Sequence, residues 1–170
     1  MATTLQFREI VNKPNAVPTA VPDPRTILDD YRKSTKLALQ AGFDGIELHS
    51  ANGYLVHQFL DATANKRTDE WGGSIENRCR FGLEALKILI EVFGADRVGI
   101  KINPCAGYND VGMEYDEQVE TYKYYIGELD KLGLAYIQMV RYVEKVSAVA
   151  GTSIETVPSL TDALNPADGP

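Results

Sequence analysis

Three short apolar segments, each preceded by an amphipathic stretch that ends near a glycine, place the strongest constraint on the fold. The three segments are FDGIELH (43–49), RVGIKIN (97–103) and LAYIQMVRY (134–142). Glycine is a common residue just after the end of a helix, and it precedes these segments at Gly42, Gly94 and Gly133. A helix followed by a buried strand, repeated along a chain, is typical of parallel strands with helices packed outside. The pattern predicts an α/β fold with parallel strands.

The capping residues and the spacing of apolar side chains locate the helices. Apolar residues that recur every three or four positions predict helices at 25–41, 54–60, 75–93 and 116–131. Asp23, followed by Pro24, is placed to cap the first helix, and Ser74 is placed to cap the third. We expect the rest of the connection between residues 50 and 73 to be loop.

The organisation along the chain predicts one folded unit with irregular flanks. Prolines interrupt residues 1–24, whereas residues 145–170 are polar and weakly periodic, so we expect an irregular first segment and a mostly disordered tail. Residues 25–144 then form the folded unit. The pattern alone leaves two architectures open, an open doubly wound sheet or part of a (β/α)8 barrel. A complete barrel requires about 250 residues, and this chain has 170.

The charge and hydropathy of the chain argue against nucleic acid and membrane as partners. Seventeen basic and 24 acidic side chains give a net charge of −7, whereas a nucleic-acid-binding surface needs a basic patch. No apolar run reaches the roughly 20 residues of a membrane-spanning helix. The N-terminal sequence MATTLQFREIV lacks the apolar core of a signal peptide. We therefore expect a cytoplasmic protein.

The segment HSANGY (49–54) is the first candidate site. His49 lies at the carboxyl end of a predicted strand, which is the edge where parallel α/β folds place their active sites. His49 and Asn52 together offer two N–H donors, which suit a substrate oxygen that gains negative charge. The hydroxyl of Tyr54 can act as a proton donor. The alternative is a polar loop in which His49 forms only structural hydrogen bonds.

Lys101 is the second candidate, because it lies in the middle of a buried strand. Lysine is uncommon there without an anionic partner. The partner is either an interior carboxylate such as Glu47 or an anionic ligand, and the sequence does not decide between them. The two histidines, His49 and His57, are eight residues apart, which matches no metal-ligand spacing, so we expect no metal site.

Three longer segments form a specific combination of motifs. They are AGFDGIELHSANGYLVHQFL, NKRTDEWGGSIENRCRF and RVGIKINP. With their patterns HxxNxY and TDE-aromatic-GGSxENRxRF, these segments resemble the Old Yellow Enzyme family over roughly residues 25–143. Members of that family are FMN-dependent, NAD(P)H-using ene-reductases built on a (β/α)8 barrel. The resemblance implies about three βα units from the middle of that barrel, without the outer strands that complete the flavin site.

The resemblance also implies a role for each candidate residue. His49 and Asn52 would hydrogen-bond the carbonyl of an α,β-unsaturated substrate such as an enone. Tyr54 would donate a proton to the α-carbon, while the reduced flavin would give a hydride to the β-carbon. Lys101 stands where the family usually has an arginine that contacts the flavin. Lysine keeps the positive charge but lacks the planar fork that forms two parallel hydrogen bonds.

Two other interpretations stay open at this point. In one, the chain is a relative without flavin, which is either inactive or a cofactor-independent isomerase or cyclase that uses His49, Asn52 and Tyr54 as acid–base groups. In the other, it is a non-enzymatic protein that self-associates. Open parallel strands leave unpaired backbone groups at the edges of a sheet, and this feature predicts a homo-oligomer.

Overall fold

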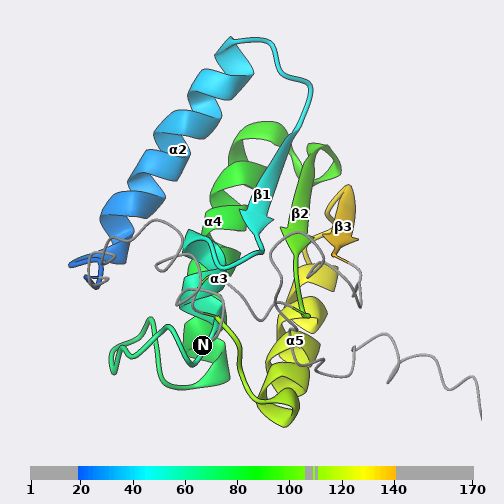
Figure 1. The fold of residues 1–170 in the computed structure, drawn as a ribbon. Coiled ribbons are helices and arrows are strands. Elements are labelled where there is room, and N and C mark those ends of the chain that lie inside the picture. Colours follow the sequence, from blue (N-terminus) through cyan, green and yellow to red (C-terminus); the bar gives the residue numbers. More distant parts are fainter. Residues whose placement is uncertain (1–18, 106–108, 110, 141–170) are drawn as a thin grey trace, which may run out of the picture.

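The computed structural model describes residues 19–105, 109 and 111–140, which form a three-stranded sheet and its helices (Figure 1). The elements are helix α2 (Pro24–Gln40), strand β1 (Ile46–Ser50), helix α3 (Leu55–Leu60), helix α4 (Ile75–Phe93), 3-10 helix η1 (Ala95–Arg97), strand β2 (Val98–Ile102), helix α5 (Tyr115–Asp130) and strand β3 (Tyr136–Met139). The predicted alternation of helices and strands is therefore confirmed. The predicted tail, 145–170, lies outside the described residues.

The predicted caps begin the two long helices. The side chain of Asp23 accepts a hydrogen bond from the backbone N–H of Arg25 at 3.0 Å, and Pro24 occupies the first helical position. The hydroxyl of Ser74 accepts from the backbone N–H of Asn77 at 3.3 Å. Both caps satisfy N–H groups that have no partner inside the helix.

Strand β1 begins at Ile46 and not at the predicted Phe43. The backbone N–H of Phe43 donates to the carbonyl of Ala38, and that of Gly42 donates to the carbonyl of Leu39. These hydrogen bonds satisfy the last carbonyls of α2 and keep the chain in a turn. The strand ladder therefore starts three residues later than the apolar pattern predicts.

The three strands are parallel and lie in the order β1–β2–β3. Leu48 of β1 pairs with Ile100 of β2, which pairs in turn with Ile137 of β3. In a parallel sheet, paired residues project from the same face. Each row of the sheet therefore brings one side chain from every strand to the same side.

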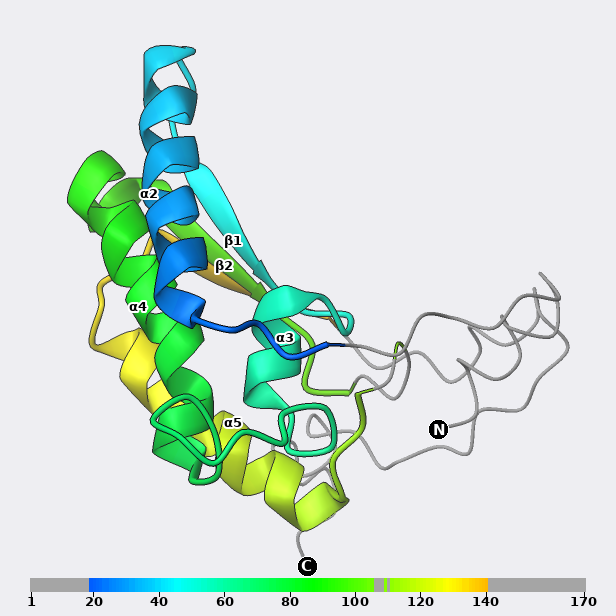
Figure 2. The ribbon, with the colours of Figure 1, turned by 90° about the vertical axis from the view of Figure 1, so that its left-hand side faces the viewer.

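The two faces of the sheet differ in their cover. Figure 2 shows α2, α4 and α5 on one side, and Leu48, Val98 and Ile100 are buried there, each at most 2% exposed. On the opposite face, Glu47 and His49 are exposed. The predicted alternation of apolar and functional side chains along β1 is thus confirmed, and the second face is open among the described residues.

Helix α4 is the centre of the apolar core and packs against α2, α3, α5 and the sheet. Its interior glycine, Gly82, lies against Tyr125 of α5 and Val56 of α3, and a β-carbon at this position would collide with the tyrosine hydroxyl. A glycine inside a helix costs about 1 kcal/mol relative to alanine. The absence of a β-carbon at Gly82 leaves room for Tyr125, which is 1% exposed. The hydroxyl of Tyr125 lies 3.3 Å from the hydroxyl of Ser50.

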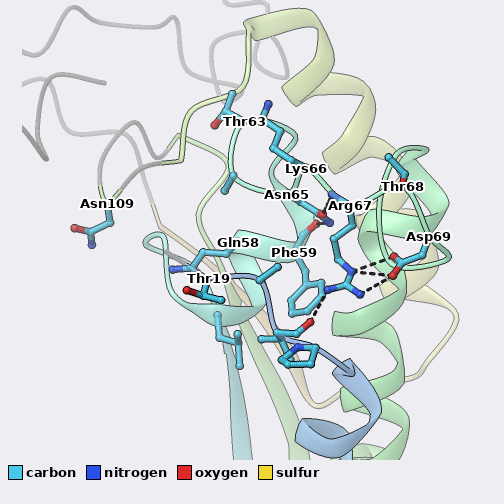
Figure 3. Close-up of a pocket in the computed structure, with 15 residues that line it drawn as sticks. Thr19, Gln58, Phe59, Thr63, Asn65, Lys66, Arg67, Thr68, Asp69 and Asn109 are labelled. Carbon is cyan, nitrogen blue, oxygen red and sulfur yellow. Dashed lines mark hydrogen bonds and ion pairs between the residues drawn. The ribbon is translucent and has the colours of Figure 1, made fainter. Parts of the chain in front are cut away.

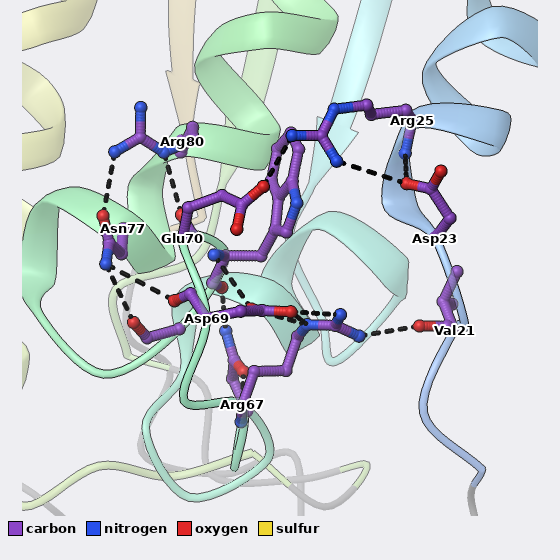
Figure 4. A network of polar contacts seen from close by, with 11 residues as sticks. Val21, Asp23, Arg25, Arg67, Asp69, Glu70, Asn77 and Arg80 are labelled. Carbon is purple, nitrogen blue, oxygen red and sulfur yellow. Dashed lines mark hydrogen bonds and ion pairs between the residues drawn. The ribbon is translucent and has the colours of Figure 1, made fainter.

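The loop between α3 and α4 has no helix or strand but is held by ionic contacts (Figure 4). The guanidinium of Arg67 pairs with Asp69 at 2.5 Å and donates to the backbone carbonyl of Val21 at 2.7 Å. Arg80 of α4 donates to the backbone carbonyl of Glu70 at 2.8 Å. The loop is therefore tied both to the segment before α2 and to the start of α4.

Arg78 is a buried cation, with 4% of its surface exposed. Its guanidinium donates to the backbone carbonyls of Leu60 at 3.1 Å and Gly73 at 2.5 Å. It also donates to the hydroxyl of Thr121 at 3.0 Å and pairs with Glu117 at 3.1 Å. A buried charge is tolerated only when its hydrogen-bonding capacity is used. One side chain thus joins the end of α3, the loop before α4, and α5.

We predict that Arg78→Met destabilises the fold by about 3 kcal/mol, because the buried carbonyl of Leu60 and the buried hydroxyl of Thr121 lose their donor. The matched control is Arg80→Met in the same helix, whose guanidinium is only half-buried. The control should cost less than about 1 kcal/mol. Urea unfolding followed by circular dichroism measures both free energies. Equal losses for the two variants would contradict a special role for Arg78.

Candidate active site

The four predicted site residues converge on the open face, at the carboxyl ends of β1 and β2. His49 of β1 pairs in register with Lys101 of β2, which pairs with Gln138 of β3. Asn52 and Tyr54 follow in the turn between β1 and α3. The structure therefore brings His49, Asn52, Tyr54 and Lys101 to one edge of the sheet.

His49 and Tyr54 are in contact. Their ring centroids lie 5.3 Å apart with the planes tilted by 52°. Tyr54 is 58% exposed, and among the described residues no side chain hydrogen-bonds its hydroxyl. The two rings offer an N–H group and an O–H group to the same open space.

Lys101 forms no ion pair with Glu47, which was one of the two alternatives for its partner. Within residues 19–105, 109 and 111–140, no carboxylate lies within ion-pair distance of the Lys101 ammonium. The hydroxyl of Tyr136 instead hydrogen-bonds Glu47, and this bond is the main reason that the pKa of Tyr136 is raised. Among the described residues, the charge of Lys101 is therefore not neutralised by a carboxylate.

Tyr136 fills the row of the sheet beneath Lys101. That row contains Glu47, Gly99 and Tyr136. The aromatic ring of Tyr136 lies over Gly99, where a β-carbon would overlap the ring. A tyrosine on β3 therefore covers the position that a side chain at residue 99 would occupy.

Asn52 is held in a left-handed backbone conformation, with φ of 60°, which asparagine tolerates better than most residues. Its side-chain oxygen accepts a hydrogen bond from Nδ2 of Asn103 at 2.7 Å. Its backbone carbonyl accepts from Nδ2 of Asn109 at 2.9 Å. The turn after β1 is thus fastened to the segment after β2.

A buried pair, His57 and Tyr122, lies behind this turn. His57 is 2% exposed and Tyr122 is fully buried. Nδ1 of His57 accepts from the backbone N–H of Gly53 at 3.2 Å. The hydroxyl of Tyr122 lies 3.3 Å from Nε2 of His57 and donates to the backbone carbonyl of Asn103 at 3.0 Å. No sequence pattern marks this network, because its members come from α3, α5 and the end of β2.

Burial lowers the pKa of His57 to about 4, from an ordinary value of 6.5. The nearby carboxylate of Asp61 acts in the opposite direction, and His49 adds a small lowering effect. A proton on Nδ1 would also displace the hydrogen bond from the N–H of Gly53. His57 is therefore neutral near pH 7, with its proton on Nε2.

A separate pocket of about 800 Å³ lies between α3, the loop that follows it, and the residues before α2 (Figure 3). Leu55, Gln58 and Asn109 line it together with Arg67 and Asp69, and none of the four candidate residues does. Figure 3 shows that Arg67 and Asp69 are paired with each other. The open face of the sheet, and not this pocket, is therefore the candidate active site.

The motifs around this site match a known family. Residues 22–159 match the model of the NADH:flavin oxidoreductase / NADH oxidase family. The chain belongs to this family. The match extends beyond Val143, where we expected the resemblance to end.

The names of relatives in this family describe different activities. Chanoclavine-I aldehyde reductase ifgG of Penicillium roqueforti is 45% identical over 112 residues, covering 66% of this chain and 30% of the relative. The probable inactive dehydrogenase easA of Claviceps fusiformis is 43% identical over 131 residues, covering 75% of this chain and 34% of the relative. The chain therefore spans about a third of the length of these curated relatives.

A solved structure supports the fold assignment. The old yellow enzyme homologue from Zymomonas mobilis superposes with a TM-score of 0.77 at 29% identity, over 89% of this chain and 42% of that structure. The resemblance to the Old Yellow Enzyme family is thus confirmed. The described strands and helices are part of a (β/α)8 barrel, and the doubly wound alternative is wrong.

Among the described residues, no helix has the length and apolar character needed to cross a membrane.

We predict that stability falls as the pH drops from 6.5 to about 4. In this interval the unfolded chain binds a proton at His57 that the folded chain does not, so protons favour unfolding. The lowered pKa corresponds to a loss of up to about 3 kcal/mol. Urea unfolding at several pH values measures it.

The control is His57→Gln, which removes the titrating group. Its free energy of unfolding should depend less steeply on pH between 6.5 and 4 than that of the unchanged chain. Carboxylates contribute to both slopes equally, so the difference isolates His57. Identical slopes would contradict a buried neutral histidine.

Proposed function

We propose that the protein is an FMN-dependent oxidoreductase that reduces the C=C bond of α,β-unsaturated carbonyl compounds with NAD(P)H. The observation that carries this proposal is the contact of His49 with Tyr54 beside Lys101 on the open face of the sheet, with Asn52 in the turn between the two rings. Family membership supports the same reaction class. Because the chain spans about a third of its relatives, the proposal concerns the site to which these residues contribute.

His49 and Asn52 bind the substrate carbonyl in this proposal. The carbonyl oxygen gains negative charge as the β-carbon is reduced, and two N–H donors aimed at it stabilise that charge. The donors are held before substrate arrives, His49 by strand β1 and Asn52 by its bonds to Asn103 and Asn109. Such preorganisation lowers the cost of forming the charged transition state.

Tyr54 supplies the proton to the α-carbon. Its hydroxyl lies on the exposed side of the turn, next to His49, where it can reach a carbon near the bound carbonyl. A positioned phenol is a competent general acid for a carbon that develops negative charge. In this proposal the contact with His49 keeps the tyrosine ring beside the carbonyl that His49 binds.

The open face fits part of an FMN molecule. FMN, when bound, supplies the hydride that reaches the β-carbon. Lys101 would hold the electron-rich edge of the flavin ring, and its fit rests on a half-buried ammonium without a carboxylate partner among the described residues. Lys101 is the cofactor contact that we assign.

The first test measures FMN binding and enone reduction. Titration of the purified protein with FMN should give saturable binding with a shifted flavin absorption band. With bound FMN and NADPH or NADH, 2-cyclohexen-1-one should be consumed. The absence of saturable FMN binding would overturn the proposal for this chain and favour the flavin-free alternatives.

The second test separates the roles of the site residues. His49→Ala should raise KM for 2-cyclohexen-1-one about 10-fold, since one hydrogen bond to the carbonyl is lost. Tyr54→Phe should lower kcat at least about 100-fold with little change in KM, because a general acid acts only in the transition state. Tyr124→Phe on α5, away from the open face, is the control and should change neither constant. Unchanged kcat in Tyr54→Phe would refute the proton-donor role.

The other two interpretations correspond to distinct results. If the protein converts a substrate without flavin, and both His49→Ala and Tyr54→Phe abolish this activity, the result would indicate an isomerase or cyclase. Within the described residues β1 and β3 are the outer strands, and self-association through them predicts a larger mass in size-exclusion chromatography with light scattering.

A further inference from the structure

We infer that Asn103, supported by Tyr122 and His57, is a positioning residue that orients the side-chain amide of Asn52 with its NH₂ group toward the substrate. This inference rests on the proposed function for the role of Asn52, but the orientation itself follows from hydrogen bonds within the chain. Two backbone donors and one backbone acceptor determine the direction of every bond in the network. Backbone groups cannot exchange donor and acceptor, so they remove the usual ambiguity of asparagine amides and histidine rings.

The first backbone donor is the N–H of Cys105. It donates to Oδ1 of Asn103 at 3.1 Å, so the amide oxygen of Asn103 must face residue 105. The NH₂ group of Asn103 must then face the other way, and it donates to Oδ1 of Asn52 at 2.7 Å. Asn103 is 2% exposed, so water does not offer it another partner.

The consequence falls on Asn52. Because its oxygen accepts from Asn103, its NH₂ group occupies the other branch of the planar amide and points away from Asn103. Within residues 19–105, 109 and 111–140, no acceptor for this NH₂ group is found. A reversed Asn52 amide would set one NH₂ group against another. The amide of Asn52 is therefore held as a donor toward a ligand oxygen.

The second backbone donor is the N–H of Gly53, which makes Nδ1 of His57 an acceptor at 3.2 Å. Nε2 of His57 must then carry the proton and donate it to the hydroxyl of Tyr122 at 3.3 Å. The Tyr122 hydrogen is left to donate to the backbone carbonyl of Asn103 at 3.0 Å. This chain of bonds fixes the backbone of Asn103, while Cys105 fixes its side chain.

The arrangement makes the site selective for an oxygen that accepts hydrogen bonds. A carbonyl oxygen can accept from Asn52, whereas a group that only donates would meet a second donor. Free rotation of the Asn52 amide would weaken carbonyl binding, because the amide oxygen would then face the substrate carbonyl for part of the time. Asn103 thus acts through Asn52 and does not touch the substrate.

The experiment compares Asn103→Leu and Asn103→Asp at pH 8. Leucine removes the donor to Asn52, and a carboxylate replaces that donor with an acceptor that attracts the Asn52 NH₂ group away from the substrate. In the FMN-loaded protein, KM for 2-cyclohexen-1-one should rise about 10-fold in Asn103→Asp and less in Asn103→Leu. The control is Asn77→Asp, which makes the same amide-to-carboxylate change and removes a side-chain donor, in this case to the backbone carbonyl of Gly72, at a position outside the turn.

A double-mutant cycle with Asn52→Ala distinguishes positioning from general damage. If Asn103 acts through Asn52, its substitution should have no further effect on KM in the Asn52→Ala background. An equal rise of KM in both backgrounds would overturn the inference, and so would no rise in either Asn103 variant.

A measurement without flavin keeps the inference separate from the proposed function. In ¹⁵N-labelled unmodified protein, the NH₂ protons of Asn103 should exchange with solvent at least about 10-fold more slowly than those of Asn52. Among the described residues, only the NH₂ group of Asn103 is both buried and hydrogen-bonded. Long-range ¹H–¹⁵N NMR should find the His57 proton on Nε2. The same exchange rate for both amides, or a proton on Nδ1, would overturn the inference even if enone reduction is found. The expected pattern in a protein that does not reduce enones would sink only the proposed function.

Discussion

The buried guanidinium of Arg78 is the interaction on which the arrangement of the helices depends. It sits on α4, the helix that contacts every layer of the core, and it bonds groups from α3, α5 and the loop before α4. The bond to the carbonyl of Leu60 holds the end of α3 against α4. Since α3 begins directly after the turn that contains Asn52, a cation remote from the open face helps to hold the helix that follows this turn.

The fold could be predicted to a large extent because its signals are local. Caps at Asp23 and Ser74 and glycines after the helices each depend on a few neighbouring residues. Strand boundaries were harder, and β1 starts at Ile46 because backbone donors before it close the turn of α2. The identity of an apolar residue such as Phe43 does not indicate whether its backbone N–H will bond a helix carbonyl or a neighbouring strand.

The candidate site divides in the same way. His49, Asn52, Tyr54 and Lys101 could be identified because strand ends and buried cations are visible in a sequence. The residues behind them could not, because Asn103 and Asn52 are 51 positions apart and Tyr122 and His57 are 65 apart. Hydrogen bonds across such separations leave no periodic pattern, and a tyrosine on an apolar helix stripe looks like any other core residue. The residues proposed to contact a ligand can thus be identified from local sequence, whereas the residues that orient them are brought together only by the tertiary fold.

The ring of Tyr136 over Gly99 has a consequence for variation at this site. The two positions share one volume, so a larger residue at 99 is compatible with the fold only if residue 136 becomes smaller. Because the hydroxyl of Tyr136 also bonds Glu47, three neighbouring strands are linked into one block that must change together. The block is the row next to His49, Lys101 and Gln138 on the same face of the sheet. It therefore limits how far a molecule bound at those residues can extend toward the amino ends of the strands.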